Sequence, residues 1–419
     1  MSVSSEIDVQ AVPPTTGPSS AQGDRRRTAY GPEFWCAYIA NTALMVAITL
    51  MYRYADFVLY LDGTEWTVGR IVGVGMVGSL VMRFFQGFGI DHFGPRKIWL
   101  SSMALFVISL LGHVWITDVD GPAIYLLRIL YSTSVAGAFG ASITSVSRSL
   151  PVARMAEVIG SLGTSGFIAM ALGPQLGDYF CGHPDLTRGD LDAMFYVAAA
   201  LGSLSLICAE FGTRGEARPR RRRRPPLVWL LRRYHPGSVM LLGVVMGVSF
   251  VLPTTFLPTY TQELGIPRTG YFFIVYASTA FLARMATRHF PERIGVKPMI
   301  YIGLAALVAS LVSYLPVRSE AYLMLPGLFA GISHAVLFPS VTAQGSTAFP
   351  NRYRGLGTTV MLAMLDIGVL IGAPLIGGLV QTSKSSNLPP YETMFLVLAI
   401  GATAAGVFYA VTNRGAKAA

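Results

Sequence analysis

The chain has 419 residues, of which 13% are charged, about half the share usual in soluble globular domains. Apolar residues make up 53% of the chain, and 44 residues are glycine. This composition excludes a disordered chain, a collagen-like chain and an ordinary soluble enzyme. The net charge is nevertheless +10, so the placement of the excess basic residues must be explained.

Residues 1–30 are rich in Ser, Pro, Gly and Thr and close with three arginines, which predicts a disordered tail. The first apolar run begins only after this tail, so we expect no cleaved signal peptide. Three cysteines, Cys36, Cys181 and Cys208, follow no spaced pattern, and neither a disulfide scaffold nor a metal site is indicated.

Apolar runs of about 19–26 residues then recur, each long enough to cross a bilayer as a helix. We predict twelve of them, at 35–60, 69–88, 98–117, 122–147, 155–180, 191–211, 237–262, 269–290, 298–316, 321–346, 355–380 and 390–411. The predicted fold is all-α and integral to a membrane, with six-helix bundles at 31–211 and 237–413. Residues 212–236 would link the bundles, and 414–419 would form a C-terminal tail.

The basic residues indicate the orientation of these helices. Most of the 32 Lys and Arg residues fall in the tail and in every second connection. The opposite connections carry acidic residues instead: Asp62, Glu65, Asp118, Asp120, Asp185 and Asp190. Because basic loops stay on the cytoplasmic side, we predict a multi-pass protein of the cell inner (cytoplasmic) membrane with both termini in the cytoplasm.

The predicted linker contains a run of arginines between Arg218 and Arg224. Such a run can bind nucleic acid, or it can fix orientation and contact anionic membrane lipid. We favour the contact with lipid and expect no nucleic-acid partner. The run joins two apolar bundles, and no folded domain that could recognise nucleic acid lies beside it in the sequence. A membrane-anchored scaffold protein that uses this run is a remote alternative.

The two halves of the chain resemble each other at three places, and the sequence separation between the paired segments is nearly the same each time. The paired segments are Asp91–Arg96 with Glu292–Lys297, Arg148–Arg154 with Phe349–Arg354, and Gly173–Gly177 with Ala373–Gly378. Two six-helix halves related by duplication are an architecture known from transporters.

The junction of the second and third predicted helices reads Gly87-Phe-Gly-Ile-Asp91-His-Phe-Gly94-Pro-Arg96-Lys97. Spelled G-x-x-x-D-x-x-G-x-R-K, it resembles the hallmark loop of the major facilitator superfamily (MFS). The resemblance in layout covers nearly the whole chain after residue 30. It implies the MFS fold of two pseudo-symmetric bundles and a cytoplasmic gating loop; a short basic turn without a gating role is the alternative. Gly94 permits a tight turn, and Asp91 can accept hydrogen bonds at a helix N-terminus.

Two further elements resemble the antiporter branch of that superfamily. Arg128 matches an arginine kept in the fourth helix, although the usual glycine four residues later is Ser132 here. The fifth helix resembles the pattern G-x8-G-x3-G-P-x2-G at Gly160, Gly173, Pro174 and Gly177.

Ala169 replaces the middle glycine of this fifth-helix pattern, and the second half repeats part of it as Pro374 and Gly377. We expect these small residues to let helices of the two halves approach and slide, while proline bends the helix. The stretch from Gly331 to Pro339 also resembles sugar-efflux-type bacterial permeases of the superfamily.

Ionisable residues inside the predicted helices are costly and therefore informative. Asp366 and His334 lie near the middle of adjacent helices, at one depth, and as a carboxylate–imidazole pair they would exchange a proton. A polar pair that only fixes packing is the alternative. Arg128 would face a cavity or reach to the surface. Arg53 and Asp56 lie one turn apart and would pair locally or contact substrate.

We find no ATP-binding loop and no Ser-His-Asp order, so we expect no enzyme and no cofactor. Uphill transport would then draw on a proton gradient. The most direct interpretation is a monomeric secondary transporter that exports a small organic solute, sugar-like or amphipathic, in exchange for protons. Proton-coupled uptake by a symporter is the alternative.

Overall fold

The computed structural model describes residues 31–148, 152–215 and 227–413, without the side chains of 87, 88, 91, 148, 152–160, 227, 228 and 352. The predicted tails 1–30 and 414–419 and the arginine run of the linker lie outside the described residues. All regular elements in the described part of the chain are helices.

The first half of the chain contains α1 (Pro32–Leu50), η1 (Met51–Arg53), α2 (Tyr54–Tyr60), α3 (Glu65–Phe93), α4 (Pro95–His113), α5 (Pro122–Arg148), α6 (Val152–Cys181) and α7 (Arg188–Gly212). A short helix, α8 (Leu227–Arg233), precedes the second half. The second half contains α9 (Val239–Val251), η2 (Leu252–Phe256), α10 (Leu257–Glu263), α11 (Gly270–Thr287), α12 (Phe290–Ile294), α13 (Val296–Ser313), η3 (Glu320–Leu323), α14 (Met324–Thr347), η4 (Asn351–Tyr353), α15 (Arg354–Ser385) and α16 (Pro390–Thr412).

Among the described residues, nine helices or runs of consecutive helices are long and apolar enough to cross a membrane. The helices α4, α6 and α11 are not among the nine, so the count of twelve spans stays a prediction.

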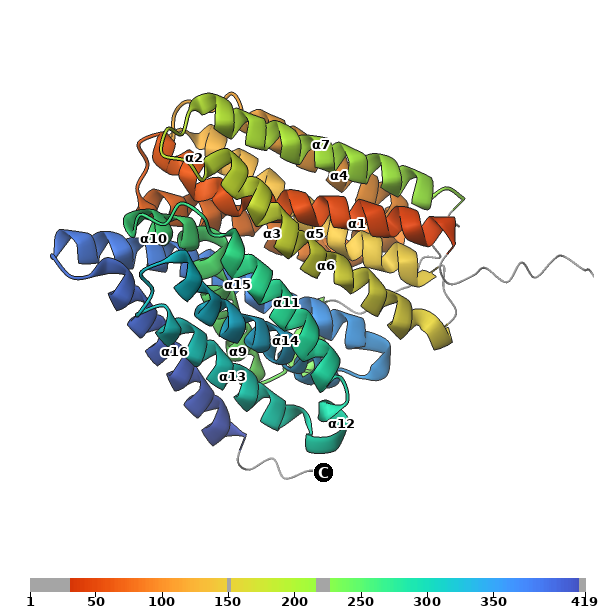
Figure 1. The fold of residues 1–419 in the computed structure, drawn as a ribbon. Helices are drawn as coiled ribbons and strands as arrows, with labels where there is room; N and C mark the ends of the chain where they lie inside the picture. Colours follow the sequence, from red (N-terminus) through yellow and green to blue (C-terminus); the bar gives the residue numbers. More distant parts are fainter. Residues whose placement is uncertain (1–30, 149–151, 216–226, 414–419) are drawn as a thin grey trace, which may run out of the picture.

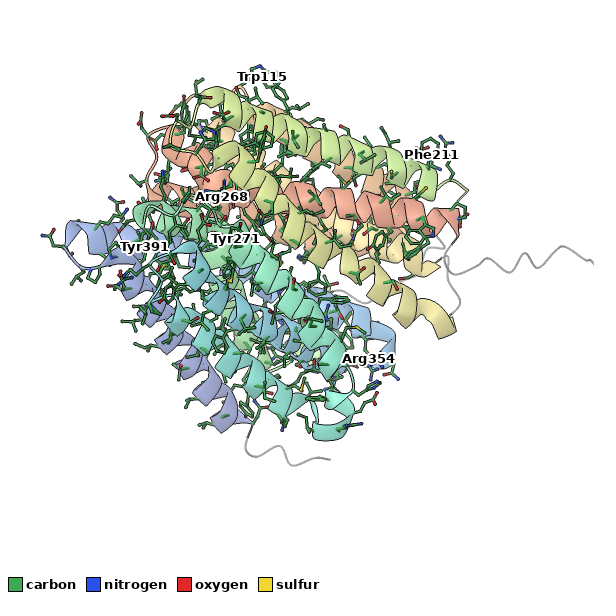
Figure 2. The ribbon with its side chains drawn as sticks, viewed as in Figure 1. Trp115, Phe211, Arg268, Tyr271, Arg354 and Tyr391 are labelled. Atoms are coloured by element: carbon green, nitrogen blue, oxygen red, sulfur yellow. The ribbon has the colours of Figure 1, made fainter. Side chains whose placement is uncertain are left out.

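Large apolar side chains remain exposed on the outer faces of the bundles, including Trp115 and Phe211 near opposite ends of the first bundle (Figure 2). Such an exterior is expected where lipid replaces water as the solvent.

The connections alternate between two ends of the molecule. We call the end formed by 61–64, 114–121, 182–187 and 264–269 the acidic end, and the opposite end, which includes Gly94 and Gly295, the basic end. Gly94 and Gly295 have φ angles of 88° and 84°, and each separates two helices. Only glycine adopts this conformation without strain, so the tight turn predicted at Gly94 is confirmed and recurs at its repeat-related position.

One helix of each half is interrupted at a corresponding place. The 3-10 turn η1 separates α1 from α2, and the π-helical turn η2 separates α9 from α10. Pro253 lies within η2, where its missing N–H removes one hydrogen bond of the helix. The two interruptions contact each other across the halves.

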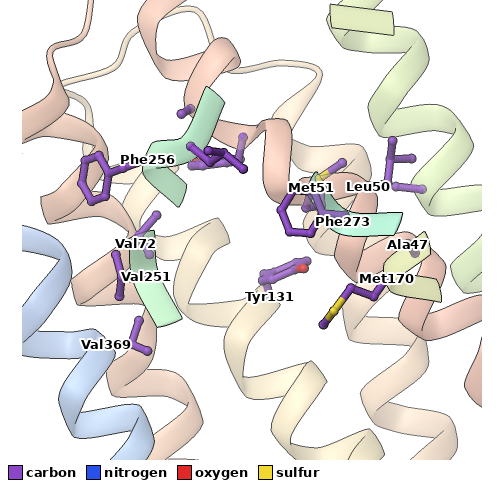
Figure 3. Packing of buried hydrophobic residues seen from close by; sticks show 14 of the residues in the cluster. Ala47, Leu50, Met51, Val72, Tyr131, Met170, Val251, Phe256, Phe273 and Val369 are labelled. Atoms are coloured by element: carbon purple, nitrogen blue, oxygen red, sulfur yellow. The ribbon is translucent and has the colours of Figure 1, made fainter. Parts of the chain in front are cut away.

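The two bundles join through reciprocal helix pairs. Helix α3 of the first half packs on α15 of the second, and α6 of the first packs on α11 of the second. Figure 1 shows the two bundles side by side with these helices between them. A continuous apolar core spans the junction, with Met51 and Tyr131 from the first half near Phe273 from the second (Figure 3).

Glycines allow the close approach of α3 and α15. A Cβ atom at Gly69 would overlap the backbone carbonyl of Ala373, and one at Gly73 would lie 2.7 Å from the ring of Pro374. Gly377 similarly faces the backbone of Glu65. Backbone atoms cannot move aside as a flexible side chain can, so these positions hold the helix pair at its present separation.

We therefore expect Gly69→Ala to lower the melting temperature of the purified protein in detergent, since overpacking a tight contact costs about 1–3 kcal/mol. The matched control is Gly401→Ala in α16, where nothing lies within 4 Å of the added Cβ. Alanine is a better helix former than glycine, so the control should melt at the same temperature or slightly higher. Equal melting temperatures for the two variants would contradict the proposed close contact.

Candidate functional site

A buried ion pair connects the two halves through α3 and α15. Arg83 Nε donates to Asp366 Oδ2 over 2.5 Å, and Arg83 Nη2 donates to Oδ1 over 3.3 Å. Ser79, one turn earlier on α3, donates to the same Oδ2 over 2.5 Å. The side chain of Asp366 is 6% exposed and that of Arg83 15%. The carboxylate of Asp366 thus accepts three hydrogen bonds, all of them from the opposite half.

The predicted pairing of Asp366 with His334 is wrong. His334 Nδ1 lies 2.6 Å from the hydroxyl of Tyr276, and Phe250 and Phe338 surround its ring. The two residues lie on neighbouring helices, as expected, but a buried carboxylate is neutralised best by a cation, and α3 supplies one. Their separate roles in proton transfer stay predictions.

A second buried ion cluster lies at the acidic end. Arg53 Nη2 donates to Asp178 Oδ1 over 2.5 Å, and Arg53 Nη1 lies 3.5 Å from Asp56 Oδ2. The local pairing of Arg53 with Asp56 is therefore present, but Asp178 of α6 is the closer partner. All three side chains are about 5–6% exposed.

Asp178 carries this cluster across to the second half. Its Oδ2 accepts hydrogen bonds from the backbone N–H groups of Thr269 and Gly270, over 2.9 and 2.6 Å. These groups begin α11, where the helix dipole favours a negative charge. Arg53 also donates to the carbonyl of Pro267 over 2.7 Å. Sequence reasoning missed Asp178, although it directly follows Gly177 of the fifth-helix pattern.

Lys384 forms another contact between the halves at this end. Its Nζ lies 2.5 Å from Glu65 Oε1 on α3 and 3.2 Å from Glu263 Oε2 on α10. The side chains of Lys384 and Glu263 are 37% and 41% exposed, so solvent screening reduces the energy of their attraction.

Arg128 lies on α5 and is 8% exposed. Its guanidinium is held between two tyrosine rings, 4.4 Å from the centre of Tyr54 and 4.6 Å from that of Tyr131. Its Nε atom is buried and has no hydrogen-bond partner among the described residues. The predicted alternatives were a cavity or the surface, and burial excludes the surface.

The residues of the predicted gating loop contact their own half. Arg96 donates to Glu210 Oε1 of α7 over 2.5 Å, while Lys97 is exposed. The side chain of Asp91 and the surroundings of Gly87 lie outside the described residues. A gating role of this loop stays a prediction.

The fifth-helix glycines do not contact the other half as expected. Gly173 faces Thr49 of α1, and Gly177 faces Arg53 of η1, both within the first bundle. The cross-half contacts of their pattern are made instead by its counterpart in α15, where Pro374 and Gly377 face α3. The surroundings of Gly160 lie outside the described residues.

In the part of the chain that the structure describes, no group of three or more His, Cys, Asp or Glu residues is placed to hold a metal ion. The groups that the site does offer supply acid–base and electrostatic chemistry: a carboxylate shared between halves, an imidazole beside a phenol, and a buried guanidinium.

Comparisons with known proteins identify the family of the chain. The sequence profile of the Major Facilitator Superfamily matches residues 34–319 and 289–419. The staphylopine export protein of Staphylococcus aureus (strain Mu50 / ATCC 700699) is 22% identical over 86% of this chain and 89% of its own. The multidrug efflux pump Tap of Mycobacterium tuberculosis (strain ATCC 25618 / H37Rv) is 22% identical over 87% of this chain and 92% of its own.

Solved structures show the same fold at low sequence identity. A crystal structure of the nucleoside transporter NupG covers 91% of this chain and 98% of its own, with a TM-score of 0.67 at 14% identity. A crystal structure of a D-xylose-proton symporter covers 89% of this chain and 96% of its own, with a TM-score of 0.70 at 14% identity. The chain belongs to the major facilitator superfamily and is a multi-pass membrane transporter rather than an enzyme.

Proposed function

We propose that the protein is a secondary transporter that exports a small organic solute in exchange for protons by alternating access. The observation that carries the proposal is the Asp366–Arg83 pair, a buried carboxylate that binds one half of the molecule to the other. An ion-coupled transporter needs such a group, because binding of the ion must change the contacts between the moving parts.

The distribution of charge supports the orientation. Basic residues gather at the basic end, so this end would face the cytoplasm and the acidic end the exterior. In this orientation both termini are cytoplasmic, and the arginine run of the linker would contact anionic lipid. We further propose that the protein lies in the cell inner membrane and works as a monomer with two six-helix domains.

Protonation of Asp366 would weaken its attraction to Arg83. A neutral carboxyl group keeps a hydrogen bond but loses most of the Coulomb energy that offsets the burial of the guanidinium. The contact between α3 and α15 would then loosen, and the halves would move relative to each other. Deprotonation on the other side of the membrane restores the pair, so each cycle carries a proton with the movement.

The Arg53–Asp178 cluster would close the acidic end in this state. Asp178 joins Arg53 of the first half to the N-terminus of α11 in the second. Its bonds must break before a solute can leave on that side. The proposed cycle thus alternates between two contacts that join the halves at different depths: the Asp366–Arg83 pair and the Arg53–Asp178 cluster.

The names of the relatives favour export over uptake. Two relatives that match most of the chain are described as an export protein and an efflux pump. Among the structures with the same fold, a D-xylose-proton symporter supports the alternative of proton-coupled uptake. The direction of the driving proton gradient distinguishes the two modes.

Asp366→Asn should abolish gradient-driven transport while preserving exchange. In inside-out vesicles, a solute that stabilises the purified protein in a melting screen should enter wild-type vesicles when their interior is acid. Asp366→Asn should abolish this uptake, a loss of at least about tenfold, because an amide side chain cannot take up and release the coupled proton. Exchange of labelled for unlabelled solute without a gradient should persist.

The matched control is Asp192→Asn, which removes a carboxylate that pairs with Arg188 within α7. It should keep gradient-driven uptake. Full gradient-driven uptake by Asp366→Asn would contradict proton coupling at this residue, and uptake driven by an alkaline vesicle interior would favour the symporter.

Asp178→Asn should open the acidic end. We would introduce Thr269→Cys, a position 2% exposed beside Asp178, after replacing Cys36, Cys181 and Cys208 by serine. Labelling of the introduced thiol by an impermeant maleimide should become at least about tenfold faster when Asp178→Asn is added, because unpairing Arg53 disfavours the closed state.

Asp185→Asn, which changes an exposed carboxylate in the connection that follows α6, serves as the control and should leave the labelling rate unchanged. An equal labelling rate with and without Asp178→Asn would show that this cluster does not hold the acidic end closed.

A further inference from the structure

The chain has two buried arginines among its described residues, and their surroundings differ. Arg53 is 4% exposed and lies beside the carboxylates of Asp178 and Asp56. Arg128 is 8% exposed and has no ion pair and no hydrogen bond in the described part of the chain. A guanidinium is always charged, and burying it without a counter-charge costs several kcal/mol.

The tyrosine rings beside Arg128 offset part of this cost but leave its hydrogen-bonding edge free. Contacts with the rings of Tyr54 and Tyr131 occupy the flat faces of the guanidinium. The N–H groups project from its edge, and that edge matches the two oxygens of a carboxylate. The Nε atom on this edge is buried without an acceptor.

Ser132 lies one turn further along α5, and it too has a buried polar atom without a hydrogen-bond partner among the described residues. Its hydroxyl oxygen is buried without a partner, whereas the neighbouring hydroxyls of Thr133 and Ser134 donate to carbonyls of their own helix over 2.8 and 2.6 Å. A helical serine normally satisfies itself in that way. A buried hydroxyl that does not do so is available to a ligand.

The stem of the Arg128 side chain and the hydroxyl of Ser132 both lie against Gly75 of α3. A Cβ atom at Gly75 would lie 2.6 Å from Cγ of Arg128 and 3.3 Å from the hydroxyl of Ser132. The glycine therefore allows both side chains to lie against the helix backbone together. The glycine usual at position 132 in the antiporter pattern would provide no such donor.

The two tyrosine side chains beside Arg128 are held in position by other contacts. The Tyr54 hydroxyl lies 3.2 Å from His113 Nε2, and His113 Nδ1 lies 2.7 Å from the carbonyl of Ser109. The Tyr131 ring packs on Phe106 with ring centres 5.3 Å apart. Donors fixed before a ligand arrives lose little conformational entropy on binding.

We propose that Arg128 and Ser132 form an anion-binding subsite that takes the carboxylate of the transported solute. The Arg128 edge donates to the carboxylate, and the Ser132 hydroxyl donates a further hydrogen bond. The substrate class is thus a small organic acid. This assignment rests on the proposed transport function, because it makes the bound carboxylate part of the solute.

The test is the melting temperature of the purified protein in nanodiscs. The probes are a panel of aliphatic and aromatic mono- and dicarboxylates that includes succinate and benzoate, each paired with its amide. Sodium chloride and inorganic phosphate at equal ionic strength complete the set. We expect saturable stabilisation by at least one carboxylate and none by its amide, by chloride or by phosphate.

Arg128→Gln should abolish the stabilisation by carboxylate, and Ser132→Ala should raise its half-saturating concentration about three- to tenfold, as expected for one hydrogen bond. Ser134→Ala is the matched control, since that hydroxyl is satisfied within α5, and it should behave as wild type. If Arg128→Gln does not fold, Arg128→Lys and Ser132→Ala decide: both should weaken carboxylate binding without changing the melting temperature of the unliganded protein by a comparable amount.

Three results would overturn the subsite: no carboxylate stabilises the wild type, the amides stabilise it equally, or Arg128→Gln keeps the effect. Stabilisation by phosphate or chloride alone would instead identify a site for inorganic anions. The measurement uses no proton gradient, so the carboxylate-dependent shift of the wild-type protein does not depend on whether Asp366 couples transport to protons. Failure of proton coupling at Asp366 and failure of the subsite at Arg128 are thereby separate outcomes.

Discussion

A charge placed inside an apolar helix bundle must be neutralised by another group of the same molecule, and this requirement shapes the junction between the two halves. Asp366 is neutralised by Arg83 of the opposite half. Asp178 is neutralised by Arg53 and by the N-terminus of α11. In both clusters a carboxylate holds together helices that the proposed alternating-access cycle would have to separate. The energy of the buried charge is thus linked to the arrangement of the bundles.

Close backbone packing and ion pairing act together along α3 and α15. Gly69 and Gly73 bring α3 near Ala373 and Pro374, and further along the same helix pair Arg83 reaches Asp366. Without the close approach the guanidinium and the carboxylate would have to be solvated by water. Neutralising the carboxylate would remove the electrostatic part of the contact and leave only close packing to hold the two helices together. In the proposed cycle, a proton on Asp366 would therefore weaken this junction without unfolding either bundle.

Several features of the fold were predictable because they depend on local chemistry. A left-handed glycine between two helices is required at Gly94, and the matching segment at Gly295 repeats it. The apolar runs fix the helical class, and the family follows from one loop motif. The site was less predictable. Asp366 was singled out by its burial in an apolar helix, but its partner Arg83 is far away in sequence, and Asp178 was hidden at the end of a small-residue pattern.

The sequence by itself determined the helices, the basic and acidic ends, and the small set of ionisable residues that lie inside apolar helices. These depend on hydropathy, charge and turn chemistry, which act over a few residues. The tertiary structure alone decided which charges meet between distant helices, because those pairs join positions more than a hundred residues apart, as Arg53–Asp178 and Arg83–Asp366 do. It also decided that Arg128 has no carboxylate beside it among the described residues, since the packing of α3, α5 and the start of α2 determines what can reach a buried guanidinium.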